Sequence, residues 1–194
     1  MCRWVAHAGP EIYLEDLIFH QEHSIVSQSL AATQSAWATN GDGFGVAWYN
    51  QRTVPGLFKD VLPAWNDANL RSIAAHTKTK LFFAHVHYPH REGTTDSEAL
   101  FLVALSKGLI QDPIAAIQAT LRDVTTIMDK YKADEPMRIS CALTNGQDMW
   151  AFRYSSDDQS PSMYYGAPHT RASENGLHPI TTIASEPLDS DAAH

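Results

Sequence analysis

The apolar positions of this chain follow two patterns, short continuous runs and stripes with helical spacing. Mostly apolar runs typical of buried strands occupy residues 44–49 and 80–86, and residues 2–8 predict a further short strand. Stripes with helical spacing occupy residues 14–19, 24–30 and 65–76. The first strand is expected to stop at Gly9-Pro10, a dipeptide typical of turns. In the third helix, Leu70, Ile73 and Ala74 share one face, which predicts that this face is buried.

The middle of the chain predicts two longer helices. The first contains the apolar block at residues 99–105 and is expected to be a core helix. Its start, Thr95-Asp-Ser-Glu98, has the pattern of a capping box, in which Thr95 would cap the helix and Glu98 would reach back. The second helix spans residues 113–131 and carries an amphipathic stripe. The residues of that stripe are Ile114, Ile117, Leu121, Val124 and Met128.

Strand patterns return after these helices. Residues 138–144 and 149–154 flank Asn145-Gly146, and an Asn-Gly pair between two strand-like runs is typical of a hairpin. Two more short strands are expected at residues 161–165 and 181–185, with loop elsewhere in 155–180. Strands, then helices, then strands again predict layered α+β packing rather than a βαβ series.

Composition and charge narrow the class of protein. The chain has 194 residues, 44% of them hydrophobic, which fits one globular domain with its own core. The net charge of −8 argues against binding to nucleic acid or to an anionic membrane, because Lys and Arg supply that affinity. Two cysteines, Cys2 and Cys141, are too few for a disulfide framework, so we expect reduced thiols and a cytoplasmic protein. We recognise no secretory leader and no run long enough to span a bilayer.

The candidate nucleophile is Cys2. Once Met1 is removed, the Cys2 thiolate would attack a carbonyl carbon, and the free α-amine of the same residue would move the proton. An α-amine has a reference pKa of about 7.7–8.0, so it is partly neutral near physiological pH. The alternative is that Cys2 is a small buried strand residue. If Met1 is retained, the amine is part of a peptide bond and this chemistry fails.

The opening Met-Cys-Arg-Trp-Val-Ala-His-Ala-Gly-Pro resembles the start of class II glutamine amidotransferases. The resemblance is strongest to the small stand-alone group that includes γ-glutamyl amide hydrolases. Further motifs that resemble the family follow in its order along the chain. They are Asn40-Gly-Asp-Gly-Phe-Gly45, Pro63-Ala-Trp-Asn-Asp67, Ala84-His-Val86, Thr95-Asp-Ser-Glu98 and Ala184-Ser-Glu-Pro187.

The resemblance implies a fold and an activity. The fold would be α+β, a four-layer αββα sandwich of the N-terminal nucleophile hydrolase type, formed by residues 1–194 as a single domain. The activity would be hydrolysis of the side-chain amide of glutamine or of a γ-glutamyl compound through a Cys2 thioester. No cofactor is implied. A separate synthase partner would use the released ammonia, or the enzyme would simply hydrolyse the amide.

The resemblance also assigns residues around Cys2. Asp96 would bind the α-amino group of glutamine, and His85 would belong to the substrate-binding residues. The first residues of the Gly-rich loop would support the site: Asn40, Gly41, Asp42 and Gly43. Compensation of the helix dipole is an alternative role for Asp96, and both roles can hold together.

The chain departs from the family after Val86. The family's strand motif ends in an arginine that holds the α-carboxylate of glutamine, whereas His87 follows here. The family also has a longer stretch with an oxyanion Asn-Gly pair, and Asn145-Gly146 is not its positional match. One explanation is an inactive relative that serves as a binding or regulatory module. The other, which we favour, is that the natural protein has additional residues near 86–94 and after 194.

A metal site is the remaining alternative. His85, His87 and His90 lie close together in the sequence, and zinc sites use three or four such ligands. The chain has neither Cys-x-x-Cys nor His-Glu-x-x-His. We therefore expect a structural His85, loop histidines and no metal.

Overall fold

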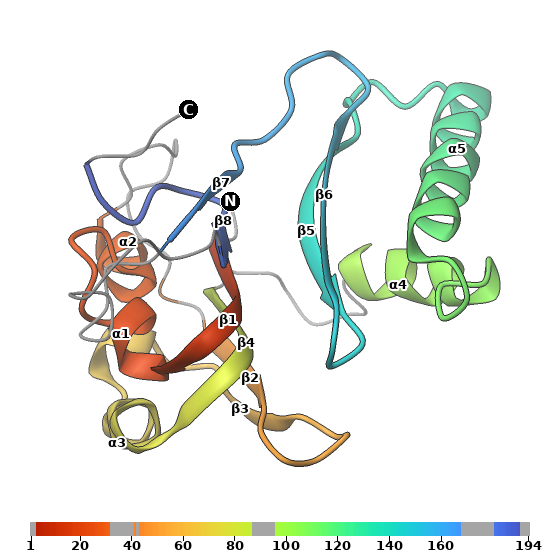
Figure 1. The fold of residues 1–194 in the computed structure, drawn as a ribbon. Helices are drawn as coiled ribbons and strands as arrows, with labels where there is room; N and C mark the ends of the chain where they lie inside the picture. The colour runs from red at the N-terminus through yellow and green to blue at the C-terminus, as the bar shows by residue number, and fades with distance from the viewer. Residues whose placement is uncertain (1–2, 32–40, 42, 87–95, 168–180, 191–194) are drawn as a thin grey trace.

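The computed structural model describes residues 3–31, 41, 43–86, 96–167 and 181–190. Within them the chain forms a mixed α/β fold with two antiparallel sheets (Figure 1). The larger sheet has the strand order β3-β2-β4-β1-β8-β7. Its strands are β1 (Arg3–Tyr13), β2 (Phe44–Tyr49), β3 (Gly56–Asp60), β4 (Lys78–Val86), β7 (Tyr164–Gly166) and β8 (Thr182–Ala184). The smaller sheet is a hairpin of β5 (Arg138–Thr144) and β6 (Met149–Ser155).

Strand β1 continues through Gly9-Pro10 to Tyr13, so the predicted stop at this dipeptide is wrong. A shift of register between Ala8 and Ile12 keeps β1 paired with β4 on both sides of the dipeptide. Such an irregularity tolerates a proline, which has no N–H to donate to a regular ladder. Gly9 has a packing role instead, since a Cβ atom there would lie 2.4 Å from a methyl carbon of Thr181.

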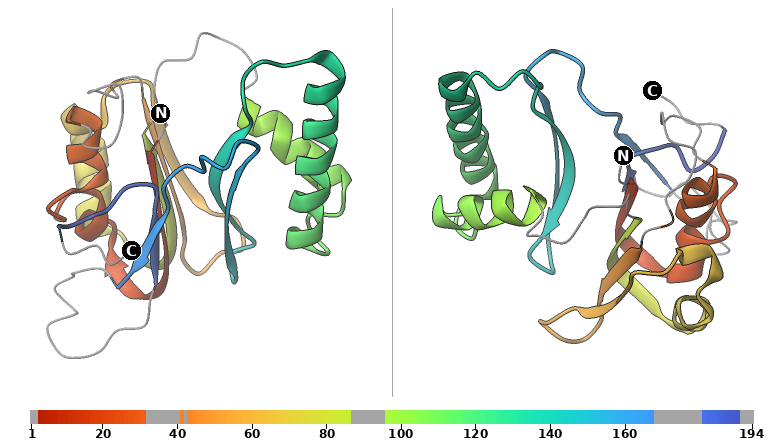
Figure 2. Two further views of the ribbon diagram at one scale, coloured as in Figure 1. Left: turned by 90° about the horizontal axis from the view of Figure 1, so that it is seen from above. Right: turned by 180° about the vertical axis from the view of Figure 1, so that it is seen from behind.

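Three short α-helices and one 3-10 helix cover one face of the larger sheet (Figure 2). They are α1 (Leu14–Ile18), α2 (Ile25–Leu30), the 3-10 helix η1 (Ala64–Asn66) and α3 (Ala68–His76). The predicted helix at residues 65–76 is therefore two elements. The break is at Asp67, whose carboxylate accepts a hydrogen bond from the backbone N–H of Leu70 at 2.7 Å and caps α3.

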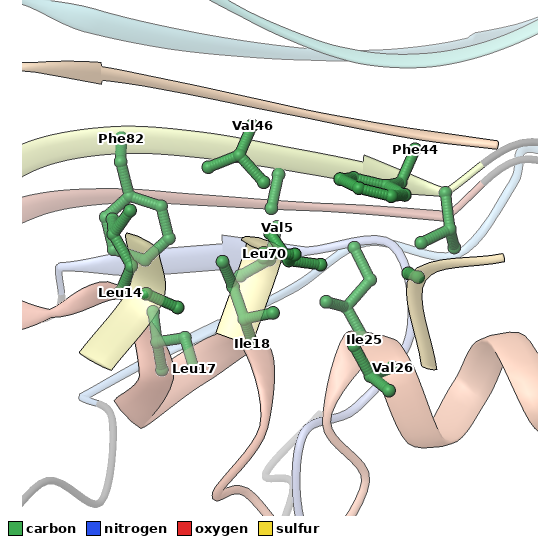
Figure 3. Close-up of a cluster of buried hydrophobic side chains, with 14 of the residues drawn as sticks. Val5, Leu14, Leu17, Ile18, Ile25, Val26, Phe44, Val46, Leu70 and Phe82 are labelled. Atoms are coloured by element: carbon green, nitrogen blue, oxygen red, sulfur yellow. The ribbon is translucent and has the colours of Figure 1, made fainter. Parts of the chain in front are cut away.

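The main core lies between these helices and the larger sheet (Figure 3). Its largest apolar members include Leu14, Leu17, Ile18, Leu70 and Phe82. The buried face predicted for α3 is confirmed, with Leu70 and Ala74 fully buried and Ile73 packed against them.

Strand β3 was not predicted. Its residues alternate between half-buried and exposed, and it pairs with β2 alone at the edge of the sheet. An edge strand of this kind lacks the continuous apolar run that marked β2 and β4.

The predicted elements of the second half are present, but the two short strands have other bounds. The strand predicted at 161–165 is β7 at Tyr164–Gly166, and the strand predicted at 181–185 is β8 at Thr182–Ala184. Helix α5 (Pro113–Tyr131) has the predicted bounds, and β5 and β6 flank Asn145-Gly146 as expected. Helix α4 (Asp96–Ser106) is not the expected core helix, because Ala104 is its only buried residue among those described. Its apolar residues surround the whole helix, while only one side packs on α5, so Leu102 is 57% exposed.

The hairpin lies on the side of the larger sheet opposite α1–α3, and α4 and α5 lie beyond the hairpin (Figures 1 and 2). Trp4 links the two sheets, since its indole Nε1 donates to the carbonyl oxygen of Ser140 in β5 at 3.1 Å. Of the helices that the structure describes, none has both the length and the apolar character needed to cross a membrane.

Candidate functional site

Four segments that the sequence singles out meet at one end of the larger sheet. Arg3, the first residue of β1, pairs with Val86, the last residue of β4. Val86 also pairs with Phe44, the first residue of β2. Val5 pairs with Ala184, so the chain that leaves β8 runs toward the same end. The antiparallel register thereby gathers the start of β1, the end of the Gly-rich loop and the ends of β4 and β8. We call this region the motif end of the sheet.

The predicted nucleophile Cys2 lies outside the residues that the structure describes, as do Asn40, Asp42 and Thr95. Arg3 follows Cys2 directly in the chain and is almost fully buried at the motif end. The residue next to the predicted nucleophile is therefore part of a well-packed central strand.

The described part of the Gly-rich loop needs its glycines. Gly43 has a φ of 126°, in the region that L side chains rarely adopt, and a Cβ there would lie 2.7 Å from the carbonyl oxygen of Asp60. A Cβ on Gly41 would lie 3.0 Å from the Trp65 ring. Trp65 belongs to η1, so the Pro63-to-Asp67 motif packs against this loop. Both motifs thus help to shape the start of β2.

His85 lies on the opposite face of the sheet from the main core. It pairs with Trp4 on one side and with Gly45 on the other, one position before the core-facing row of Val86. His85 is half-buried. It therefore shares its face with Trp4, whose indole reaches across to the hairpin.

The structure adds an ion pair that sequence reasoning missed. The Arg3 Nε donates to the Glu186 carboxylate at 2.7 Å, and both side chains are almost fully buried. The bond joins residues 183 positions apart in the chain, so no local pattern could reveal it. Its only sequence signal is a charged residue inside each of two family motifs, the one around Cys2 and the one ending at Pro187.

Asp96 begins α4 and is exposed. Its carboxylate accepts a hydrogen bond from the backbone N–H of Ser97 at 2.7 Å. A carboxylate in the first turn also stabilises the helix through its interaction with the helix dipole, which is the alternative role for Asp96. No contact among the described residues joins Asp96 to the motif end of the sheet.

Two further groups have defined environments. Burial raises the pKa of the Cys141 thiol to about 11, so this cysteine is protonated and unreactive near neutral pH. Burial lowers the pKa of His7, and a hydrogen bond to the carbonyl oxygen of Pro10 partly offsets this shift.

Among the residues that the structure covers, no three His, Cys, Asp or Glu side chains gather closely enough to hold a metal ion.

Comparison with known proteins identifies the family. No family profile matches the chain. A solved structure from Silicibacter pomeroyi, described as a glutamine aminotransferase class-II domain protein, is 33% identical and superposes with a TM-score of 0.71. The similarity covers 97% of this chain and 88% of that one. The chain belongs to the class II glutamine amidotransferase family.

Two curated relatives match shorter stretches of the chain. A probable glutamine amidotransferase of Saccharomyces cerevisiae is 42% identical over 95 residues, which cover 44% of this chain and 27% of the relative. A gamma-glutamyl-hercynylcysteine sulfoxide hydrolase of Mycolicibacterium smegmatis is 30% identical over 87 residues, covering 44% and 38%. The matches thus span less than half of either relative. Their names favour an enzyme over an inactive binding module.

Proposed function

We propose that this amidotransferase hydrolyses the side-chain amide of glutamine or of a γ-glutamyl compound, with Cys2 as the nucleophile. The gathering of four family motifs at the motif end of the sheet carries the proposal. Cys2 directly precedes Arg3 in the chain, and the glycine loop ends at Phe44, which lies across β4 from Arg3 at this end. The names of the relatives, an amidotransferase and a γ-glutamyl hydrolase, support the same substrate class.

The proposed reaction has two steps. The Cys2 thiolate attacks the amide carbon, the carbon–nitrogen bond breaks, and ammonia leaves with a proton passed through the α-amine. Water then attacks the thioester, which releases the γ-carboxylate product and restores the thiol. Removal of Met1 is required, because only a free α-amine can move these protons. Ammonia leaves to solvent or to a separate synthase partner.

We propose that Asp96 binds the substrate α-ammonium group, since a charge-assisted hydrogen bond to a carboxylate is strong and directional. His85 would line the substrate side of the sheet, on the face that it shares with Trp4. Asn40, Gly41, Asp42 and Gly43 would support the site. The tight packing of Gly41 and Gly43 is consistent with this role.

We also propose that residues 1–194 form one domain with the four-layer αββα sandwich of N-terminal nucleophile hydrolases. The succession of helices, sheet, hairpin and helices in Figure 2 supports this arrangement. The additional residues expected near 86–94 and after 194 stay a prediction, because 87–95 and 191–194 lie outside the described ranges. The additional residues near 86–94 would supply the arginine and oxyanion donors of the family.

The experiment is an intact-mass measurement before and after treatment with diazo-oxo-norleucine, a glutamine-mimicking electrophile. We expect one adduct on a chain that has lost Met1. Cys2→Ala should abolish the adduct, whereas Cys141→Ala should leave it unchanged because the Cys141 thiol is held protonated. Absence of an adduct on a folded chain that has lost Met1 would contradict the proposal.

A further inference from the structure

The buried ion pair between Arg3 and Glu186 has no role in the proposed chemistry. It lies at the motif end of the sheet, where Arg3 is the residue next to Cys2. Consecutive Cα atoms are about 3.8 Å apart across a trans peptide. Whatever fixes Arg3 therefore limits where the preceding residue can lie.

Glu186 continues the pairing of β1 with the segment that follows β8. Val5 pairs with Ala184 in the sheet. At the next position the backbone N–H of Trp4 donates to the Ser185 hydroxyl at 2.9 Å, and the Ser185 N–H donates to the Trp4 carbonyl at 3.0 Å. Arg3 and Glu186 are the next pair in the same register. This clamp, from Val5–Ala184 to Arg3–Glu186, extends to the residue that directly follows the predicted nucleophile.

Stability alone is a weak reason for this ion pair. Removing two charges from water costs free energy, and apolar residues of similar volume are often as stabilising. The pair is also incompletely satisfied within the described part of the chain, where Nη1 and Nη2 of Arg3 and Oε2 of Glu186 are buried and have no hydrogen-bond partner. The neighbouring positions on this face, Val5, Phe44 and Val86, are apolar. An ion pair differs from such contacts in being directional.

We propose that the Arg3–Glu186 ion pair is a positioning device for the N-terminal nucleophile. The proposal rests on the function proposed above. Arg3 shares the core face of β1 with Val5, so it acts through the backbone of its neighbour and is not itself a catalytic residue. The pair fixes the start of β1 against the segment after β8 and thereby fixes the thiol relative to the substrate carbonyl.

The main test is the double variant Arg3→Met/Glu186→Leu, which replaces the ion pair by apolar side chains. We expect it to melt within a few degrees of the wild type. Its kcat with glutamine should fall by roughly tenfold to a hundredfold, because small misplacements of reacting groups have effects of that size. KM should change little, since both side chains are almost fully buried and lie on the core face of the sheet.

Milder variants cover the case in which the double variant does not fold. Glu186→Gln keeps the shape and should lower kcat, and Arg3→Lys keeps the charge and should retain more activity than Arg3→Met. Asp157→Asn is the matched control, because it breaks the exposed ion pair between Arg138, the first residue of β5, and Asp157, just after β6, and should leave kcat unchanged.

The outcomes separate this proposal from the proposed function. A wild-type enzyme that turns over glutamine, with variants that melt earlier but keep kcat, would overturn the positioning role alone. A folded wild-type protein without Met1 that neither turns over the amide nor forms the electrophile adduct would overturn the proposed function and this role with it. A lowered kcat at preserved melting temperature and KM supports both.

Discussion

Trp4 and Ser140 connect the two sheets, with the Trp4 indole Nε1 3.1 Å from the Ser140 carbonyl oxygen. Trp4 lies two residues after Cys2, and Ser140 lies in the hairpin. His85 shares the Trp4 face of the larger sheet through its cross-strand pairing. This hydrogen bond therefore holds the hairpin against the face of the larger sheet that carries Trp4 and His85.

Trp4→Phe should weaken the attachment of the hairpin. The variant keeps an aromatic ring but loses the donor, so the free energy of unfolding should fall by about 1 kcal/mol, as for a typical lost hydrogen bond. Urea titration followed by circular dichroism measures the change. Trp150→Phe, in the half-buried strand β6, controls for the smaller ring. Equal effects of the two substitutions would mean that the bond to Ser140 contributes nothing measurable.

Gly43→Ala should be costly, and Gly45→Ala should not. Gly43 combines a φ of 126° with an ideal Cβ position 2.7 Å from the Asp60 carbonyl oxygen. Strain of this kind costs about 1–3 kcal/mol. At Gly45 the nearest atom is the Lys59 Cβ at 3.9 Å, an ordinary contact in a regular strand. Unfolding measurements on both variants test the difference, and a Gly43→Ala variant as stable as Gly45→Ala would contradict it.

The buried His7 should make the protein less stable in mild acid. His7 is fully buried, with Nδ1 3.1 Å from the Thr182 hydroxyl and Nε2 3.0 Å from the Pro10 carbonyl. Because burial lowers its pKa below the ordinary 6.5, the unfolded chain binds more protons than the folded protein as the pH falls below that value. His7 therefore has no effect on stability above this range, and its contribution becomes unfavourable as the pH decreases through 6.5.

The measurement is the free energy of unfolding from pH 8 to pH 5 for the wild type and for His7→Gln. The wild type should lose up to about 1.4 kcal/mol per pH unit more than the variant in the acidic part of this range. His76→Gln is the control, because His76 is exposed and bonded only to the Ser72 carbonyl of its own helix in the described contacts. Parallel curves for all three proteins would exclude His7 as the source.

Local patterns explain which parts of the fold could be predicted. Helix α5 and the hairpin at Asn145-Gly146 depend on spacing and turn chemistry within a few residues, and their predicted bounds agree with the structure. Strand β3 and the passage of β1 through Gly9-Pro10 depend on partners elsewhere in the sheet. The predicted burial of α4 was wrong for a similar reason. Its packing against α5 decides which of its apolar side chains are covered, and that packing is not visible in the local sequence.

The candidate site also has residues that local motifs predict and contacts that only the folded chain shows. Cys2, Asp96 and the glycine loop could be named because each lies in a motif that resembles the family. That the start of β1 and the end of the glycine loop lie at one end of the sheet could be learned only from the strand register, in which Arg3 and Phe44 both pair with Val86. The Arg3–Glu186 bond could not be predicted, since a buried arginine and a buried glutamate look in the sequence like any two charged residues.

Asp96→Asn should raise KM for glutamine by roughly tenfold to a hundredfold with little change in kcat. The estimate corresponds to the loss of a hydrogen bond to a charged group, about 1.5–3 kcal/mol. Asparagine can still accept the hydrogen bond from the Ser97 N–H, so the start of α4 should persist. Steady-state kinetics with glutamine, together with melting curves, separates binding from folding.

Asp112→Asn is the matched control for this prediction. Asp112 caps α5 through a bond from the Ala115 N–H at 3.0 Å, so it is also a carboxylate at a helix start. Both substitutions remove a negative charge from a helix N-terminus, at a cost of about 0.3–1 kcal/mol each. Only Asp96 should affect KM, because only Asp96 is proposed to meet the substrate ammonium. If both variants lose stability equally and neither changes KM, Asp96 serves its helix alone, and another group must bind the α-amine.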